Sequence, residues 1–173
     1  MSYYTGIGSR KCPPKTLQLM TAVAKWLYDK SMILRSGGAD GADMAFEMGA
    51  GEKKEIFLPW KNFNNNDSLL YHIPDKAFEI ASKIHTAWDK CSPAAKKLHS
   101  RNVMQIFGQD LHTFSQFVIC WTPGGEEVGG TATAIRLAKK VGIPVYNLAI
   151  RSDRDYIRNE MKGVESKSLW EKD

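Results

Sequence analysis

The sequence predicts an α/β domain with a Rossmann-like, open and mainly parallel sheet that carries helices on both faces. Short apolar, β-prone runs alternate with longer segments of helical periodicity, which is the order that builds a parallel sheet. Two of these runs lead into glycine-rich turns, at residues 36–43 and 122–131, and a helix is expected after each turn. Glycine turns that open helices are typical of phosphate sites in such folds.

The N-terminal half is expected to alternate strands with helices. Pro14 suits the first turn of a helix, and apolar residues recur at helical spacing as far as Leu27. The next helix stops at Gly49 and Gly51, residues that favour helix ends. The strands are short apolar runs closed by glycine, serine or proline. In chain order the elements are expected at residues 3–7, 15–30, 32–34, 43–50 and 55–59.

The C-terminal half continues the alternation after a loop at residues 60–67. This loop is rich in Asn and longer than most connections, so we expect a lid or a binding role. The helical region that follows is divided near Ser92 and Pro93. Cys120 lies inside an apolar run and is expected in the core. The elements are expected at residues 74–112, in two or more helices, 117–121, 131–141 and 145–148.

Composition indicates one globular domain, residues 1–150, followed by a charged and partly helical tail, residues 151–173. Of the 173 residues, 43% are hydrophobic and 25% are charged, which is ordinary for such a domain. No apolar stretch approaches the roughly 18 residues that span a bilayer, and no signal peptide is recognised. Three widely spaced cysteines predict neither a metal site nor a disulfide framework, and we expect a cytoplasmic protein. The net charge of +5 fits an anionic ligand.

Four segments are expected to meet where the strands end, because ligands of open α/β sheets bind at the carboxyl edge. These segments are residues 8–10, 36–43, 59–62 and 122–131. The free amides of a helix that begins near Thr131 predict an anion site, most plausibly for a nucleotide phosphate. No prosthetic group is expected. The predicted ligand-binding residues are Gly8, Ser9, Arg10, Ser36, Gly37, Gly38, Ala39, Asp40, Asp43, Arg101, Asn102, Thr122, Pro123, Gly124, Gly125, Gly129, Gly130 and Thr131.

Several side chains have two interpretations that the sequence leaves open. Arg10 either binds phosphate through its planar fork or forms a surface ion pair. One of Asp40 and Asp43 is expected to cap the helix, and the other to accept hydrogen bonds from ribose hydroxyls. Glu126 and Glu127 either point to solvent, or one of them contacts a sugar or performs acid–base work. No P-loop motif and no nucleophile–histidine spacing is present.

The order of the glycine motifs resembles that of the SLOG superfamily, over nearly the whole chain up to Leu148. The motifs are Gly6-Ile7-Gly8-Ser9-Arg10, the segment 34–43, the pair Arg101-Asn102, and the loop 123–131. The resemblance implies a Rossmann-like fold that binds nucleotides or nucleic acid at these motifs. It also implies self-association, with a dimer through the helices of residues 74–112 as the first expectation.

Two branches of the superfamily imply different functions. The branch of DNA-processing protein A, or Smf, binds single-stranded DNA, and Gly41-Ala42-Asp43 and Arg101-Asn102 are similar to its motifs. The Lonely Guy (LOG) branch cleaves the N-glycosidic bond of nucleoside monophosphates, and His99 to Asn102 resembles its arginine segment. That branch carries a catalytic glutamate where this chain has Ala134.

The combined prediction is a protein that binds a nucleotide or nucleotide-derived ligand as a sensor or sequestering protein. N-glycosidic cleavage, or a related ribosyl transfer, is the enzymatic alternative, with Arg101, Glu126 and Glu127 as candidate catalytic residues and Asp40 as a further carboxylate. Binding of single-stranded DNA is the other alternative. No membrane partner is expected.

Overall fold

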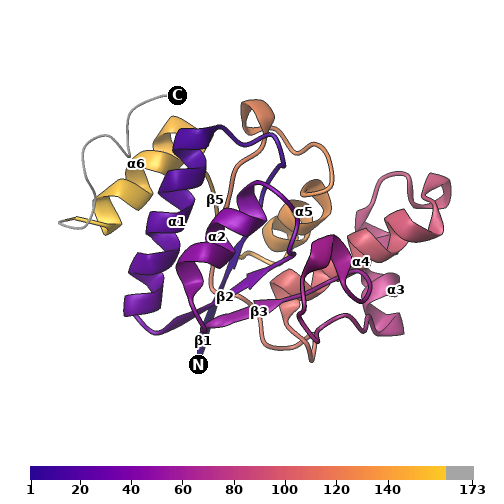
Figure 1. Cartoon of the computed structure of the whole chain (residues 1–173). Helices are drawn as coiled ribbons and strands as arrows, with labels where there is room; N and C mark the ends of the chain where they lie inside the picture. The colour runs from indigo at the N-terminus through magenta and orange to yellow at the C-terminus, as the bar shows by residue number, and fades with distance from the viewer. Residues whose placement is uncertain (163–173) are drawn as a thin grey trace.

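The sheet has five parallel strands in the order β3-β2-β1-β4-β5 (Figure 1). The structure is a computed structural model, and it describes residues 1–162. From β1 the chain adds strands in one direction, and from β4 it adds them in the other, so the strand order reverses between β1 and β4. The predicted fold class is confirmed. The strands are β1 (Ser2–Gly6), β2 (Met32–Ser36), β3 (Lys54–Ile56), β4 (Val118–Cys120) and β5 (Val145–Asn147).

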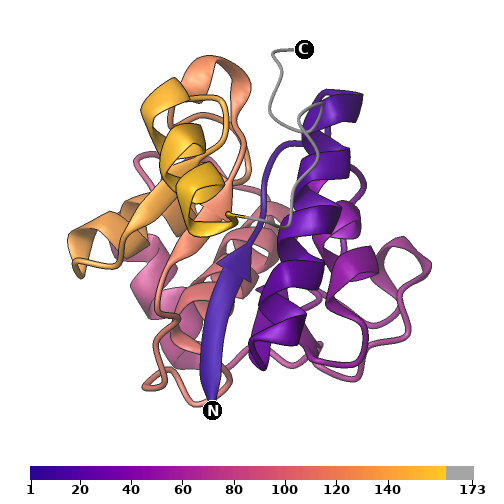
Figure 2. The same cartoon turned by 90° about the vertical axis from the view of Figure 1, so that its left-hand side faces the viewer.

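Helices cover both faces of the sheet. Helices α1, α2 and α6 pack on one face, and α3, α4 and α5 pack on the other. Seen from the side, the indigo α1 and the yellow α6 lie in front of the sheet and the pink α3 and α4 behind it (Figure 2). The helices are α1 (Pro14–Asp29), α2 (Ala42–Ala50), α3 (Asp75–Ile84), α4 (Pro93–Phe107), α5 (Ala132–Lys140) and α6 (Arg151–Glu160).

Strand β4 shows how the sequence builds two cores. Because side chains alternate along a strand, Ile119 packs into the core under α1 and α2, while Val118 and Cys120 pack into the core under α4 and α5. The prediction that Cys120 is a core residue is confirmed, since it is fully buried. A strand buried on both faces needs an apolar run rather than alternation, which is what the sequence shows.

The end of β2 differs from the expectation. The strand is expected to end at residue 34, but Arg35 and Ser36 extend it. Arg35 is only 2% exposed, and its guanidinium binds Glu55 of the neighbouring strand at 3.1 Å and stacks over Tyr3. In a sequence, a charged residue after an apolar run indicates the start of a loop. Here partners on the adjacent strands compensate the free-energy cost of burying the charge of Arg35.

The expected tail begins with α6, which packs onto the domain. Ile157 and Met161 are buried in the core that α1 and α2 form with the sheet. Residues 163–173 of the predicted tail lie outside the described residues. Within residues 1–162, none of the helices has the length and apolar character needed to cross a membrane.

Candidate functional site

A cavity of about 500 Å³ lies at the carboxyl ends of β1 and β4. This position is the point at which the strand order reverses, where open α/β sheets bind ligands. Five parts of the chain contribute walls: the segment after β1, the turn after β2 with the first turn of α2, the segment between β3 and α3, one face of α4, and the glycine loop after β4. The lining residues are Ile7, Gly8, Ser9, Arg10, Lys11, Ala39, Asp43, Phe63, Ala95, Leu98, His99, Arg101, Asn102, Gln105, Pro123, Val128, Gly129, Gly130 and Thr131.

The two chain segments that form the crevice separate only after the strands end. The amide of Ile7 donates to the carbonyl of Ile119, and the amide of Ser9 donates to that of Trp121, both at 3.1 Å. Beyond Ser9 and Trp121 the segments diverge, one towards α1 and the other into the glycine loop. The cavity occupies the space between them.

The predicted binding residues divide into two groups. Those that line the cavity are Gly8, Ser9, Arg10, Ala39, Asp43, Arg101, Asn102, Pro123, Gly129, Gly130 and Thr131. Those that the structure places elsewhere are Ser36, Gly37, Gly38, Asp40, Thr122, Gly124 and Gly125. The turn after β2 is mostly structural: Gly37 is buried against Arg101, Asp43 and Gln105. Thr122 is buried and accepts a hydrogen bond from Asn147 at 2.7 Å.

Arg101 and Asn102 connect the turn after β2 to the glycine loop. Nη1 of Arg101 donates to the carbonyls of Gly37, at 2.6 Å, and Phe57, at 3.0 Å. Its Nε donates to Oδ1 of Asn102, and Nδ2 of Asn102 donates to the carbonyl of Gly130 at 2.6 Å. Arg101 is only 5% exposed, and its burial lowers its pKa to about 10. The pair therefore fixes the position of the glycine loop.

Asp43 is the carboxylate among the lining residues. Its Oδ2 accepts the amide of Ala39 at 3.3 Å, while its buried Oδ1 forms no well-aligned hydrogen bond within residues 1–162. Burial raises its pKa to about 6, and the positive charge of Arg101 and the amides of Ala39 and Gly8 oppose this shift. The carboxylate lines the cavity, but Oδ1 itself is buried, so a donor on a ligand would reach it only after a local rearrangement.

The expected capping role of Asp40 or Asp43 is wrong. Helix α2 has Gly41 as its N-cap and no side-chain cap. Asp43 lies in the first helical turn and turns back to the amide of Ala39, and Asp40 accepts a hydrogen bond from Asn64 at 3.0 Å. Both carboxylates thus bind loop groups rather than the amides of α2.

Two glycines of the loop face open space. A Cβ atom added to Gly129 or Gly130 would meet no other atom within 4 Å, whereas at Gly8 it would come within 2.8 Å of the carbonyl oxygen of Trp121. Among residues 1–162, no hydrogen bond is found for the amides of Gly129, Gly130 and Thr131. These amides precede α5, whose N-terminus carries a partial positive charge. They can bind an anion.

The charged side chains around the cavity are mainly basic. Arg10 and Lys11 are exposed at its rim, and Arg101 lies at its base. The candidate catalytic residues Glu126 and Glu127 do not line the cavity. Glu127 pairs instead with Lys139 at 2.7 Å. This ion pair partly neutralises the negative charge that Glu127 places in the glycine loop.

One face of α4 supplies lining residues that the sequence reasoning missed. Ala95, Leu98, His99 and Gln105 join Asn102 along this face. Their spacing of three and four residues is the helical signal that would have identified the face once Asn102 was chosen. Lys11 and Phe63 were also missed. The predicted segment 59–62 does not line the cavity, and Phe63 directly follows it.

His99 binds the first turn of α5. Its Nδ1 lies 2.9 Å from Oγ1 of Thr133. Partial burial lowers its pKa to about 4, and the charges of His85, Arg101 and Arg136 add to this shift. His99 is therefore neutral near pH 7. With the Asn102 bond to Gly130, it gives α4 two contacts to the start of α5.

The comparisons with known proteins support the fold. The sequence matches no family model and no curated protein. Among solved structures, DNA processing protein A from Helicobacter pylori, which is described as binding single-stranded DNA, is similar with a TM-score of 0.59. The alignment covers 95% of this chain and 82% of that chain at 19% identity. At this identity the likeness concerns the fold alone.

Proposed function

We propose that the cavity binds a nucleotide or a nucleotide-derived ligand, with a phosphate on the amides of Gly129, Gly130 and Thr131. The observation that carries the proposal is Gly130. Its φ is not positive, and no neighbouring atom would clash with a Cβ, so neither the backbone nor the packing requires glycine there. Close approach of a ligand to the backbone is a reason for glycine at such a position.

The other walls of the cavity suit the remaining parts of a nucleotide. Arg10 and Lys11 supply positive charge at the rim, next to the loop amides. The carboxylate of Asp43 offers an acceptor for a ribose hydroxyl or a base amino group. Phe63 and Leu98 supply apolar surface for a base. The volume falls within the range of about 300–1,000 Å³ found for small-molecule sites.

Replacing Gly130 with alanine is expected to weaken nucleotide binding at least about tenfold, since a methyl group would enter the space in front of the loop amides. Stability is expected to stay within about 0.5 kcal/mol of wild type, because the methyl group contacts no protein atom. Isothermal titration calorimetry with nucleoside 5′-monophosphates, selected beforehand by thermal shift, measures the affinity. Urea unfolding measures the stability.

Gly8→Ala is the comparison variant for stability: it also adds one methyl group to a glycine that lines the cavity, but at a position where protein atoms are close. Its Cβ would approach the Trp121 backbone, so it is expected to destabilise the protein by about 1–3 kcal/mol. Gly130→Ala variants that bind every nucleotide as tightly as wild type would contradict the proposed phosphate position. Absence of any nucleotide binding by wild type would contradict the function itself.

A second candidate function is binding of single-stranded DNA. The observation that favours it is the structural likeness to a protein described as binding single-stranded DNA. The net charge of +5 and the basic rim at Arg10 and Lys11 are compatible with a phosphate backbone that enters the same cavity.

If DNA binds, its affinity is expected to fall with salt, with a log–log slope of about −0.7 for each phosphate contacted. Fluorescence anisotropy with a labelled oligonucleotide, from low to physiological salt, measures the slope. The variant Arg10→Gln is expected to make the slope less steep by about 0.7, which corresponds to the loss of one phosphate contact. Lys162→Gln lies outside the cavity and serves as control. Binding that is absent at low salt, or independent of salt, would contradict this function.

Two expectations from the resemblance stay predictions. Self-association through the helices of residues 74–112 has α3 and α4 as its candidate surfaces. For N-glycosidic cleavage, Ala134 is fully buried in α5, so a catalytic carboxylate would have to come from another position. Among the residues that line the cavity, Asp43 is the carboxylate available.

A further inference from the structure

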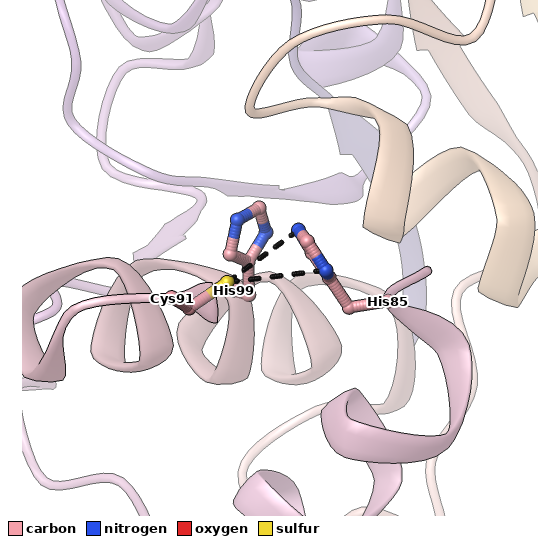
Figure 3. Close-up of side chains that lie close together, drawn as sticks. All are labelled: His85, Cys91 and His99. Atoms are coloured by element: carbon pink, nitrogen blue, oxygen red, sulfur yellow. Dashed lines mark hydrogen bonds between the residues drawn. The ribbon is translucent and has the colours of Figure 1, made fainter. Parts of the chain in front are cut away.

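Three side chains that commonly bind metals meet at the junction of α3 and α4 (Figure 3). His85 follows the last residue of α3, Cys91 precedes α4, and His99 lies on α4. One ligand atom from each residue lies within 4.8 Å of the other two. Sγ of Cys91 is 3.7 Å from Nε2 of His85 and 3.9 Å from its Nδ1, and the two imidazole rings have centroids 4.3 Å apart.

These separations fit a tetrahedral cation. For zinc, with bonds of about 2.3 Å to sulfur and 2.0–2.1 Å to nitrogen, tetrahedral geometry places the two ligand atoms roughly 3.6 Å apart. The distances from Sγ of Cys91 to the two ring nitrogens of His85 are close to this value, and the ligand atom of His99 lies within 4.8 Å of the other two. A thiolate with two imidazoles is a donor set for zinc and related ions, rather than for the hard cations magnesium and calcium.

We propose that His85, Cys91 and His99 bind one borderline-soft divalent cation of the zinc class, with a fourth position open to water or a ligand. Three protein ligands and an open position are the arrangement of catalytic rather than structural zinc sites. His99 also lines the cavity, so the cation would lie beside it. The proposal rests on these three residues and does not depend on the proposed nucleotide binding.

The hydrogen bond between His99 and Thr133 orients the His99 ring for metal binding. Its Nδ1 is 2.9 Å from Oγ1 of Thr133, so Nδ1 can carry the proton and donate it to the hydroxyl. Nε2 then keeps its lone pair for the cation. Metal-binding histidines typically have such a hydrogen bond on the other ring nitrogen, which fixes the tautomer.

His85 must exchange one contact to bind a cation. Its Nδ1 accepts the amide of Ala87 at 3.0 Å, which leaves the proton on Nε2. Binding through Nε2 moves this proton to Nδ1, and binding through Nδ1 displaces the Ala87 amide directly. Either route gives up one hydrogen bond of a partly exposed turn, while Cys91 releases its thiol proton to solvent as the metal–sulfur bond forms.

The sequence hides this site because its spacing, H-x5-C-x7-H, matches no familiar zinc pattern. The short turn at Trp88–Lys90 reverses the chain between α3 and α4 and brings the ligands together. Cys91 is partly exposed, whereas Cys12 and Cys120 are buried in the core. Cys91 is therefore the thiol within reach of an ion from solvent.

Cobalt titration of tag-free, metal-stripped protein tests the proposal. We expect one equivalent of Co²⁺ to produce a thiolate-to-cobalt charge-transfer band and tetrahedral d–d bands, both removed by Zn²⁺. Cys91→Ser is expected to abolish the charge-transfer band, and His85→Gln and His99→Gln are each expected to weaken binding at least tenfold. Cys12→Ala, His72→Gln and His112→Gln are the matched controls and are expected to bind as wild type does.

Melting curves of the metal-free variants show whether each has folded. Alkylation of Cys91, followed by mass spectrometry, gives a second readout on wild type alone, and Zn²⁺ is expected to slow it at least tenfold. A titration without a charge-transfer band, a band that persists in Cys91→Ser, or affinity unchanged in both His85→Gln and His99→Gln would overturn the proposal. So would equal alkylation rates with and without Zn²⁺.

Discussion

Replacing Arg101 with methionine is expected to lower the free energy of unfolding by about 3–5 kcal/mol, because it leaves several buried hydrogen-bond acceptors unpaired. The side chain is 5% exposed and donates to Gly37, Phe57 and Asn102. Methionine fills similar volume but leaves these acceptors unpaired and Asp43 without a compensating charge. Urea unfolding followed by circular dichroism measures the loss.

A second readout separates the role of Arg101 at the site from its contribution to stability. Because Asn102 holds Gly130 and is itself held by Arg101, hydrogen exchange in the loop 123–131 is expected to accelerate in Arg101→Met. Arg35→Met is the control: it removes an arginine that is also buried, but one bound to Glu55 and Thr113, away from the cavity. A loss below about 1 kcal/mol, or equal loop exchange in both variants, would contradict the role of Arg101.

The stability that Asp43 contributes is expected to fall as the pH rises from about 4 to about 7. The folded pKa of about 6 lies above the ordinary value of 3.8, so the folded state holds this proton more tightly than the unfolded state does. The contribution is therefore complete below pH 4 and lost above pH 6. The difference in unfolding free energy between wild type and Asp43→Asn is expected to decrease by about 3 kcal/mol over this range.

This difference isolates Asp43 from the other titrating groups. His99 acts in the opposite direction: its folded pKa of about 4 lies below the ordinary 6.5, so the stability it contributes is lost as the pH falls through this range. Subtracting the two urea profiles at each pH removes that contribution, since both proteins contain His99. A difference that stays constant from pH 4 to pH 7, or that increases, would contradict the assigned environment of Asp43.

The alternation of strands and helices was predictable because it depends on local patterns. Apolar runs and helical periodicity identified the five strands and α1 to α5 to within a few residues, but the helical region expected to reach residue 112 ends at Phe107. The end of β2 was not predictable, because Arg35 is buried by partners that come from Tyr3, Glu55 and Thr113. Those contacts join residues far apart in the sequence, which no local pattern records.

The parts of the site that follow from its position at the carboxyl edge of the sheet were predictable from the sequence. The parts that depend on side-chain packing were not. The carboxyl-edge rule selected Ser9, Arg10 and residues 129–131 of the glycine loop, and these line the cavity. The rule does not say which glycines face a ligand and which face protein. Gly37 and Gly129 look alike in the sequence, but one is packed against Arg101 and the other faces open space. The carboxyl-edge rule also does not predict the cluster of His85, Cys91 and His99, which the turn between α3 and α4 brings together.

The amides before α5 are proposed to bind a nucleotide phosphate. Titration of ¹⁵N-labelled protein with a nucleoside 5′-monophosphate, followed by amide chemical shifts, tests this binding most directly. We expect the amides of Gly129, Gly130 and Thr131 to shift together and saturate with one dissociation constant, with smaller shifts at Ser9 and Arg10. Shifts that saturate elsewhere, while these loop amides do not move, would contradict phosphate binding at this loop.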